Sequence, residues 1–146
     1  MTIPEFEHIR KEEGDYFEFY SYNLKCYGSR GPLFAWNGYI EIPKIHGFYG
    51  KYNESGSGSG IMVHGGITYD ECTEDILTIG FDCAHSGDFT PGFLYTLGER
   101  FKRDGDTYKD VEYIRTELES VSKQIHEISP EYYDVLVETL KKMNKN

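Results

Sequence analysis

The chain has 146 residues, 38% of them hydrophobic, and a formal net charge of −10. This length and composition predict one globular domain over residues 1–146, with enough apolar side chains to bury a core. The acidic balance excludes non-specific nucleic-acid binding, which depends on neutralising phosphates. No apolar stretch approaches the length of a membrane span, and the first residues lack the apolar segment of a signal peptide, so we expect no membrane partner. Three cysteines without CxxC spacing favour reduced thiols and a cytoplasmic location.

The first part of the chain predicts one short helix and two strands. Residues 5–13 place Phe6 and Ile9 on one helical face. The aromatic stretch 15–28 is typical of one long strand, and 33–43 predicts a second strand that Pro43 ends. Residues 44–60 predict a loop, whose Gly/Ser-rich part at about 53–60 is expected to be flexible. That loop is either a plain connection or a flap over a site.

Two further strands are predicted at 61–69 and 76–85, joined by a short acidic connection at 70–75. The following stretch, 86–108, is long and rich in Gly and Pro, and loops of that length are often functional. Strand alternation places Asp82 on one face, with Phe81 and Cys83 on the other. Since Phe81 is a natural core residue, we expect Cys83 to be buried. The functional centre would then be Asp82 with a histidine, because His85 at the strand end can join either side.

The C-terminal part predicts two helices. Apolar residues recur at gaps of three and four from Val111 to Ile128, with Asp106 or Thr107 as the expected cap. Residues 129–143 predict the second helix, with Ser129 as its cap. We therefore expect an α+β fold in which an antiparallel sheet of about four strands packs on the two C-terminal helices. The other sheet face, rich in Tyr and His, would bind a partner or form a homodimer.

A metal site is one hypothesis for the polar residues. His64, Cys83, His85 and Asp88 are ligand types, and Cys83 and His85 would share a strand face. No standard zinc spacing such as CxxC or HExxH is present. We therefore expect that the protein uses no metal and no cofactor. If a metal is bound, these four residues are its expected ligands.

Catalysis without metal is a second hypothesis. Cys83 could form a thiolate–imidazole pair with a histidine. Imidazoles and carboxylates could also cleave a phosphodiester by general acid–base chemistry. For an enzyme, the expected catalytic residues are His64, His85, Asp82 and Asp88.

Ligand binding without chemistry is the hypothesis that the residues favour. Tyrosine and tryptophan rings can stack on a nucleobase. Histidines can bond a phosphate or ribose, carboxylates can accept from ribose hydroxyls or base amines, and glycine turns expose backbone amides. The expected ligand-binding residues are Trp36, Tyr39, His46, Tyr49, His64, Gly65, Gly66, Thr68, Tyr69, Asp82, His85 and Asp88.

Several segments together resemble a family of short, mostly uncharacterised proteins encoded by phages and prophages. The resemblance covers roughly residues 36–125 and rests on WNGY, IPKIH, VHGGITY and GFDCAHSGD, followed by a helix that contains Tyr113 and Glu117. The NESGSGSG stretch departs from the pattern. The resemblance implies a phage protein in the host cytosol that counters antiphage defence, an inference of setting rather than activity.

Within that setting, the function we expect is sequestration of a nucleotide-derived immune signal of the cyclic dinucleotide or cyclic ADP-ribose type. A hydrolase or phosphodiesterase that cleaves such a nucleotide is the first alternative. A protein–protein inhibitor that masks a host defence enzyme with its acidic, Tyr-rich surface is the second.

Overall fold

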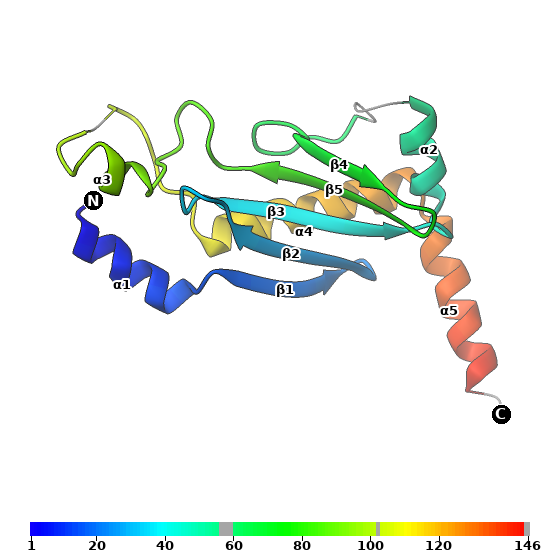
Figure 1. The fold of residues 1–146 in the computed structure, drawn as a ribbon. Helices are drawn as coiled ribbons and strands as arrows, with labels where there is room; N and C mark the ends of the chain where they lie inside the picture. The colour runs from blue at the N-terminus through cyan, green and yellow to red at the C-terminus, as the bar shows by residue number, and fades with distance from the viewer. Residues whose placement is uncertain (56–59, 102, 145–146) are drawn as a thin grey trace.

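The computed structural model describes residues 1–55, 60–101 and 103–144. The fold is α+β, as predicted, and its centre is a five-stranded antiparallel sheet with the strand order β1-β2-β3-β5-β4 (Figure 1). The elements are α1 (Ile3–Glu13), β1 (Tyr16–Ser21), β2 (Leu24–Arg30), β3 (Trp36–Pro43), α2 (Gly47–Ser55), β4 (Tyr69–Cys72), β5 (Ile76–Asp82), α3 (Phe93–Thr96), α4 (Val111–Ile128) and α5 (Glu131–Met143).

The additional strand arises where one long strand was expected. Residues 15–28 contain a hairpin, because β1 ends at Ser21 and β2 begins at Leu24. The two residues between them, Tyr22 and Asn23, have φ values of 50° and 61°. Two consecutive left-handed residues are the signature of a tight type I′ turn, which Asn favours. The Tyr-Asn dipeptide is a weaker turn signal than Asn-Gly, and so the hairpin was missed.

The strand predicted at 61–69 is wrong. Residues 61–68 are irregular, and β4 runs over Tyr69–Cys72, inside the stretch predicted to be a connection. Gly65 and Gly66 have φ values of +68° and +80°, which a strand cannot accommodate. The segment is held on α4 instead, since the Gln124 side chain accepts from Met62 N at 2.8 Å and donates to Met62 O at 2.7 Å.

The loop predicted at 44–60 contains a helix. α2 covers Gly47–Ser55, and its first turn is fixed by His46, whose Nδ1 atom accepts a hydrogen bond from Phe48 N at 3.0 Å. Phe48 and Tyr52 then carry α2 into the core. Of the predicted flexible stretch 53–60, residues 53–55 are helical, and 56–59 lie outside the described residues.

The sheet has one buried face and one open face. Along β2 and β3, buried residues alternate with half-exposed ones, and α4 packs across β1, β2 and β3 on the buried side. In Figure 1, α4 runs behind the sheet and no helix crosses the face toward the viewer. The cap of α4 is Asp110, whose Oδ1 atom accepts from Tyr113 N, so the predicted caps at Asp106 and Thr107 are wrong.

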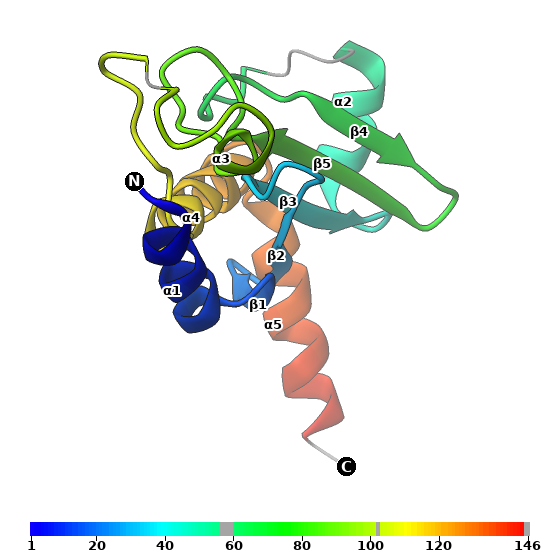
Figure 2. The ribbon, with the colours of Figure 1, turned by 60° about the vertical axis from the view of Figure 1, so that its left-hand side comes forward.

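The second C-terminal helix contributes little cover. α5 extends away from the sheet in both views (Figures 1 and 2), although Tyr132 at its start packs against the core. Ser129 is the residue that closes α4, and Pro130 precedes α5, so the predicted cap at Ser129 is wrong. None of the helices in the described part of the chain combines the length and apolar character needed to cross a bilayer.

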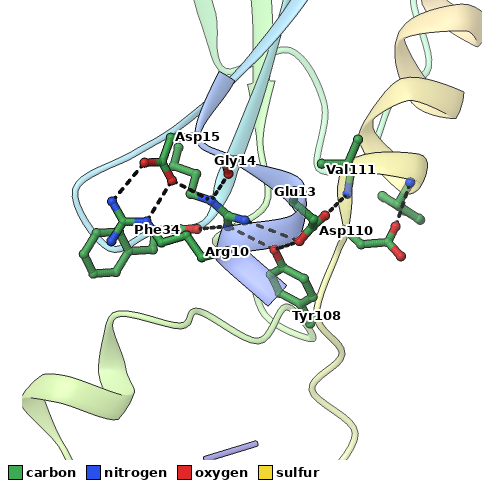
Figure 3. A network of polar contacts seen from close by, with 10 residues as sticks. Arg10, Glu13, Gly14, Asp15, Phe34, Tyr108, Asp110 and Val111 are labelled. Atoms are coloured by element: carbon green, nitrogen blue, oxygen red, sulfur yellow. Dashed lines mark hydrogen bonds and ion pairs between the residues drawn. The ribbon is translucent and has the colours of Figure 1, made fainter. Parts of the chain in front are cut away.

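A buried arginine joins α1, β2 and the segment that enters α4. The Arg30 side chain is 2% exposed and donates to Gly14 O at 3.0 Å and Phe34 O at 2.8 Å. Its guanidinium lies 4.4 Å from the centre of the Trp36 ring. Figure 3 shows the partner carboxylate, Glu13, which accepts from the Tyr108 hydroxyl and from Val111 N, both at 2.6 Å.

Candidate functional site

His64 is held at both ring nitrogens. Its Nδ1 atom lies 2.7 Å from the Tyr113 hydroxyl, and its Nε2 atom lies 2.8 Å from Oδ2 of Asp88. Since an ionised carboxylate can only accept, Nε2 carries the hydrogen of that second bond. The ring therefore has one orientation, set by α4 on one side and by the turn after β5 on the other.

Asp88 is a buried carboxylate with several donors. Its side chain is 1% exposed, and Oδ2 also accepts from His85 N at 3.0 Å. The Lys109 ammonium lies 3.2 Å from Oδ1. Burial alone would raise the pKa of Asp88, but hydrogen bonds from the His64 side chain, the His85 backbone amide and the Lys109 ammonium outweigh it, so the pKa lies below its ordinary value. Asp88 is thus ionised at neutral pH.

The Tyr113 hydroxyl remains protonated beside His64. Burial and then the Glu117 carboxylate raise the pKa of Tyr113 to about 12. Glu117 is one helical turn further along α4, on the same helical face. Tyr113 therefore serves as a hydrogen-bond donor at neutral pH and not as a tyrosinate nucleophile.

A cleft opens beside His64 on the helix side of the sheet. We name it the helix-side cleft; it is shallow and widely open to solvent, with a volume of about 470 Å³. Three apolar side chains and one carboxylate form much of its wall, and Gln124 fixes the backbone of that wall through Met62. The lining residues are Ile61, Met62, Val63, His64, Gly66 and Glu117.

Asp82 and His85 form a separate pair. His85 Nε2 lies within ion-pair distance of Asp82 Oδ1, at 2.7 Å, and Asp82 Oδ1 accepts a hydrogen bond from the Thr68 hydroxyl at 3.1 Å. The predicted association of Asp82 with a histidine is thus present. Gly65, which follows His64 in sequence, lies against the His85 ring, because a Cβ atom at Gly65 would come within 2.4 Å of that ring. The His64 and His85 ring centroids are 6.1 Å apart.

Cys83 lies in the core, as alternation predicted, at 2% exposure. Burial, followed by the Asp88 and Asp82 charges, raises the pKa of its thiol far above the ordinary value. A buried, protonated thiol is a poor nucleophile. The structure therefore argues against the Cys–His hypothesis.

Three of the four conditional metal ligands come together. A ligand atom from each of His64, Cys83 and Asp88 lies within 4.8 Å of the others, and these groups could hold a metal ion. His85 is not in that group, since its Nε2 atom faces Asp82. Lys109 already neutralises Asp88, and Cys83 would have to lose its proton, so both groups oppose a bound cation.

Three other expected ligand-binding residues pack in the core or tie elements of the fold together. Trp36 is 0% exposed and packs in the core, so in this conformation it cannot stack on a ligand. His46 is 3% exposed, fixes the start of α2, and has a pKa lowered to about 4 by burial. The Tyr49 hydroxyl donates to Thr73 O at 2.5 Å and ties α2 to the turn between β4 and β5. Trp36 and His46 are therefore corrected from ligand contacts to core residues.

Tyr39 and Tyr69 lie on the open face, on the opposite side of the sheet from the helix-side cleft. Both pair with Gly80 across neighbouring strands, and their ring centroids are 5.4 Å apart. The expected ligand residues thus form two groups. His64, Gly66 and Asp88 belong to the cleft side, whereas Tyr39, Thr68, Tyr69, Asp82 and His85 belong to the open side.

Sequence reasoning missed several residues around His64. Lys109 and Gln124 carry no motif and come from segments far from His64 in sequence, and Met62, although close to His64 in sequence, was placed in a strand. Tyr113 and Glu117 had a detectable signal, because residues four apart on a helix share a face. No role had been assigned to that pair.

We compared the chain with protein-family models, with curated proteins and with solved structures, and it matches none of them.

Proposed function

We propose that the protein binds a small nucleotide-derived signal in the helix-side cleft and withholds it from a host effector in the host cytosol. The observation that carries the proposal is the cleft of about 470 Å³ beside the doubly held His64. The cleft is open to solvent, but its partly apolar lining with few fixed polar groups resembles that of small-molecule sites. The resemblance to phage-encoded proteins supplies the setting.

The chemistry of the lining favours the nucleoside part of such a ligand. Ile61, Met62 and Val63 offer an apolar wall for a base or sugar. The Glu117 carboxylate can accept from a ribose hydroxyl or an exocyclic amine. Because Lys109 is paired with Asp88, we expect the phosphates to point out of the cleft.

The arrangement supports binding over cleavage. Metal-free phosphodiester cleavage needs an imidazole nitrogen that can take a proton from the substrate and another group that can donate one. Both nitrogens of His64 are occupied by Tyr113 and Asp88. A hydrolase remains the second candidate, since two His–Asp pairs lie with ring centroids 6.1 Å apart.

Calorimetry with a panel of cyclic dinucleotides and cyclic ADP-ribose isomers tests the proposal. We expect heat and a rise in melting temperature with at least one ligand, and about tenfold weaker binding by Glu117→Gln. The matched control is Glu127→Gln, an exposed carboxylate on the same helix. Absence of heat and of a thermal shift with every ligand would reject the proposal.

Recovery of the ligand after denaturation separates the two candidate functions. An intact ligand means sequestration, and a cleaved ligand means hydrolysis. For the hydrolase candidate, comparison of Asp82→Asn with Cys83→Ser tests the preference for the carboxylate over the thiol. If folded Cys83→Ser loses ligand cleavage while Asp82→Asn retains it, the preference for Asp82 is wrong.

A further inference from the structure

The open face carries a row of tyrosines across the sheet. Ring centroids are 6.1 Å apart for Tyr16 and Tyr27, 5.0 Å for Tyr27 and Tyr39, and 5.4 Å for Tyr39 and Tyr69. The strand register produces the row, since Tyr27 pairs with Tyr39, and both Tyr39 and Tyr69 pair with Gly80. Tyr16 and Tyr69 are 52% and 41% exposed. We name this surface, with the carboxylates described next, the tyrosine face.

Carboxylates alternate with the rings on the same face. Glu18, Glu41, Glu71 and Asp82 occupy open-face positions of four strands, and Lys25 is the cation among the strand residues there. Two carboxylates also orient rings of the row. Tyr16 donates to Glu18 at 2.8 Å, and Tyr69 donates to Glu71 at 2.6 Å. The face is therefore aromatic and acidic, and its rings are held in place.

We propose that the tyrosine face docks a basic, arginine-bearing segment of a partner protein. A guanidinium is attracted both to the face of an aromatic ring and to a neighbouring carboxylate, and this surface offers the two groups side by side. Tyrosine is also enriched in protein interfaces, where its ring contributes area and its hydroxyl hydrogen bonds. This interaction lies on the opposite side of the sheet from the helix-side cleft.

The chain itself shows how arginine uses such rings. The Arg115 guanidinium lies 4.5 Å from the Phe19 ring centre, and Arg10 lies 4.5 Å from that of Phe34. On the tyrosine face, the Lys25 ammonium is 5.8 Å from the Tyr27 ring centre. The end rings of the row, Tyr16 and Tyr69, have the carboxylates of Glu18 and Glu71 as their charged neighbours.

Charge excludes other occupants. A second copy docked through the same face would bring the acidic set of one copy, Glu18, Glu41 and Glu71, close to the same acidic set of the other, and like charges in contact are unfavourable. Nucleic acids and anionic lipid surfaces are repelled for the same reason. An uncharged apolar partner would leave Glu41 and Glu71 desolvated, whereas Glu18 already has Lys25 as an ion-pair partner at 3.6 Å.

The test uses three synthetic peptides of equal length, in which glycine alternates with arginine, lysine or glutamate. Fluorescence anisotropy measures their binding to the full chain at low and high salt. We expect the arginine peptide to bind more tightly than the lysine peptide, and the glutamate peptide not to bind. The double variant Glu41→Gln/Glu71→Gln should weaken arginine-peptide binding about tenfold, and so should Tyr39→Leu.

The control for total charge is Glu127→Gln/Glu138→Gln, which removes two exposed carboxylates from α4 and α5. This control should change binding less than twofold. Equal weakening by the two double variants would mean non-specific attraction to an acidic protein and would overturn the proposal. Equal affinity for the arginine and lysine peptides, or no binding at all, would also overturn it. So would a homodimer, detected by sedimentation, that Tyr39→Leu dissociates.

Discussion

His64 Nε2 lies 2.8 Å from Asp88 Oδ2, and the two side chains are 17% and 1% exposed. The pair joins the irregular segment before β4 to the turn after β5, and Tyr113 extends it to α4. It therefore has a structural role that can be measured without any ligand.

Loss of the Asp88 charge should destabilise the fold more than loss of one hydrogen bond. Asp88→Asn leaves the Lys109 ammonium, 13% exposed, without its counter-charge and should lower the free energy of unfolding by about 3 kcal/mol. The comparison variant Tyr113→Phe removes one hydrogen bond to His64 and should cost about 1 kcal/mol. Urea denaturation at neutral pH measures both. Equal losses would mean that the Asp88–Lys109 charge pair contributes nothing beyond a neutral hydrogen bond.

The lowered pKa of Asp88 predicts a stability loss in acid. A carboxyl group whose folded pKa lies below its unfolded value stabilises the native state above that unfolded value. Its contribution is lost as the pH falls below about 4. Asp88→Asn should therefore show a flatter stability profile there, although it is less stable at neutral pH. A profile parallel to that of the unmodified chain would contradict the lowered pKa.

The lowered pKa of His46 predicts that stability also depends on pH above the range in which Asp88 acts. Burial lowers the pKa of His46 to about 4, so between about pH 6.5 and 4 the unfolded chain binds a proton that the native state does not. As the pH is lowered through this window, the free energy of unfolding should fall by up to about 1.4 kcal/mol per pH unit. His46→Asn retains a side-chain acceptor for Phe48 N and should remove the slope. The control His8→Asn, at a 72% exposed side chain, should leave it unchanged.

Thiol labelling should distinguish the three cysteines. Cys72 is exposed, whereas Cys26 and Cys83 are buried, and burial raises the pKa of Cys26 to about 12. We expect iodoacetamide to modify Cys72 alone in the native protein and all three cysteines in denaturant, as read by intact mass spectrometry. Rapid labelling of native Cys83 would contradict its core position and restore the thiol hypothesis.

Two glycines should respond in opposite ways to alanine. A Cβ atom at Gly38 would lie 2.5 Å from the Phe81 ring, so Gly38→Ala should cost about 1–3 kcal/mol. Gly50 is in α2 with open space around it, so Gly50→Ala should be neutral or stabilise by up to about 1 kcal/mol. Thermal unfolding followed by circular dichroism measures both. A stable Gly38→Ala would show that the Phe81 ring can move aside at little cost.

The α+β fold and α4 could be predicted because periodicity reports which side chains are buried. The apolar stripe of α4 and the alternation that buries Cys83 are local patterns. The hairpin at Tyr22–Asn23 could not be found that way, because it depends on a backbone conformation with a weak residue signal. The strand predicted at 61–69 was wrong because its apolar residues pack on α4 instead of pairing in the sheet.

The sequence allowed us to predict many of the residues of the candidate site, but not which of them lie next to one another in the fold. Spacing placed Asp82 near His85, and these residues are close in sequence. The partners of His64 come from α4 and from the segment before it, and only the tertiary fold brings them together. Trp36 was misplaced because an aromatic residue in a strand can face either side, and its pairing with Arg30 was not visible.

The contact between Glu13 and Val111 makes folding of the two halves of the chain interdependent. Glu13 ends α1 and accepts from the first amide of α4, while the same carboxylate accompanies the buried Arg30. Detachment of α1 would remove the Glu13 carboxylate from the buried Arg30 guanidinium, which would keep Asp15 as its ion-pair partner, and would leave the Val111 amide without its acceptor. α1 and the start of α4 should therefore open as one cooperative unit, with matched hydrogen-exchange rates for Val111 and the central amides of α1.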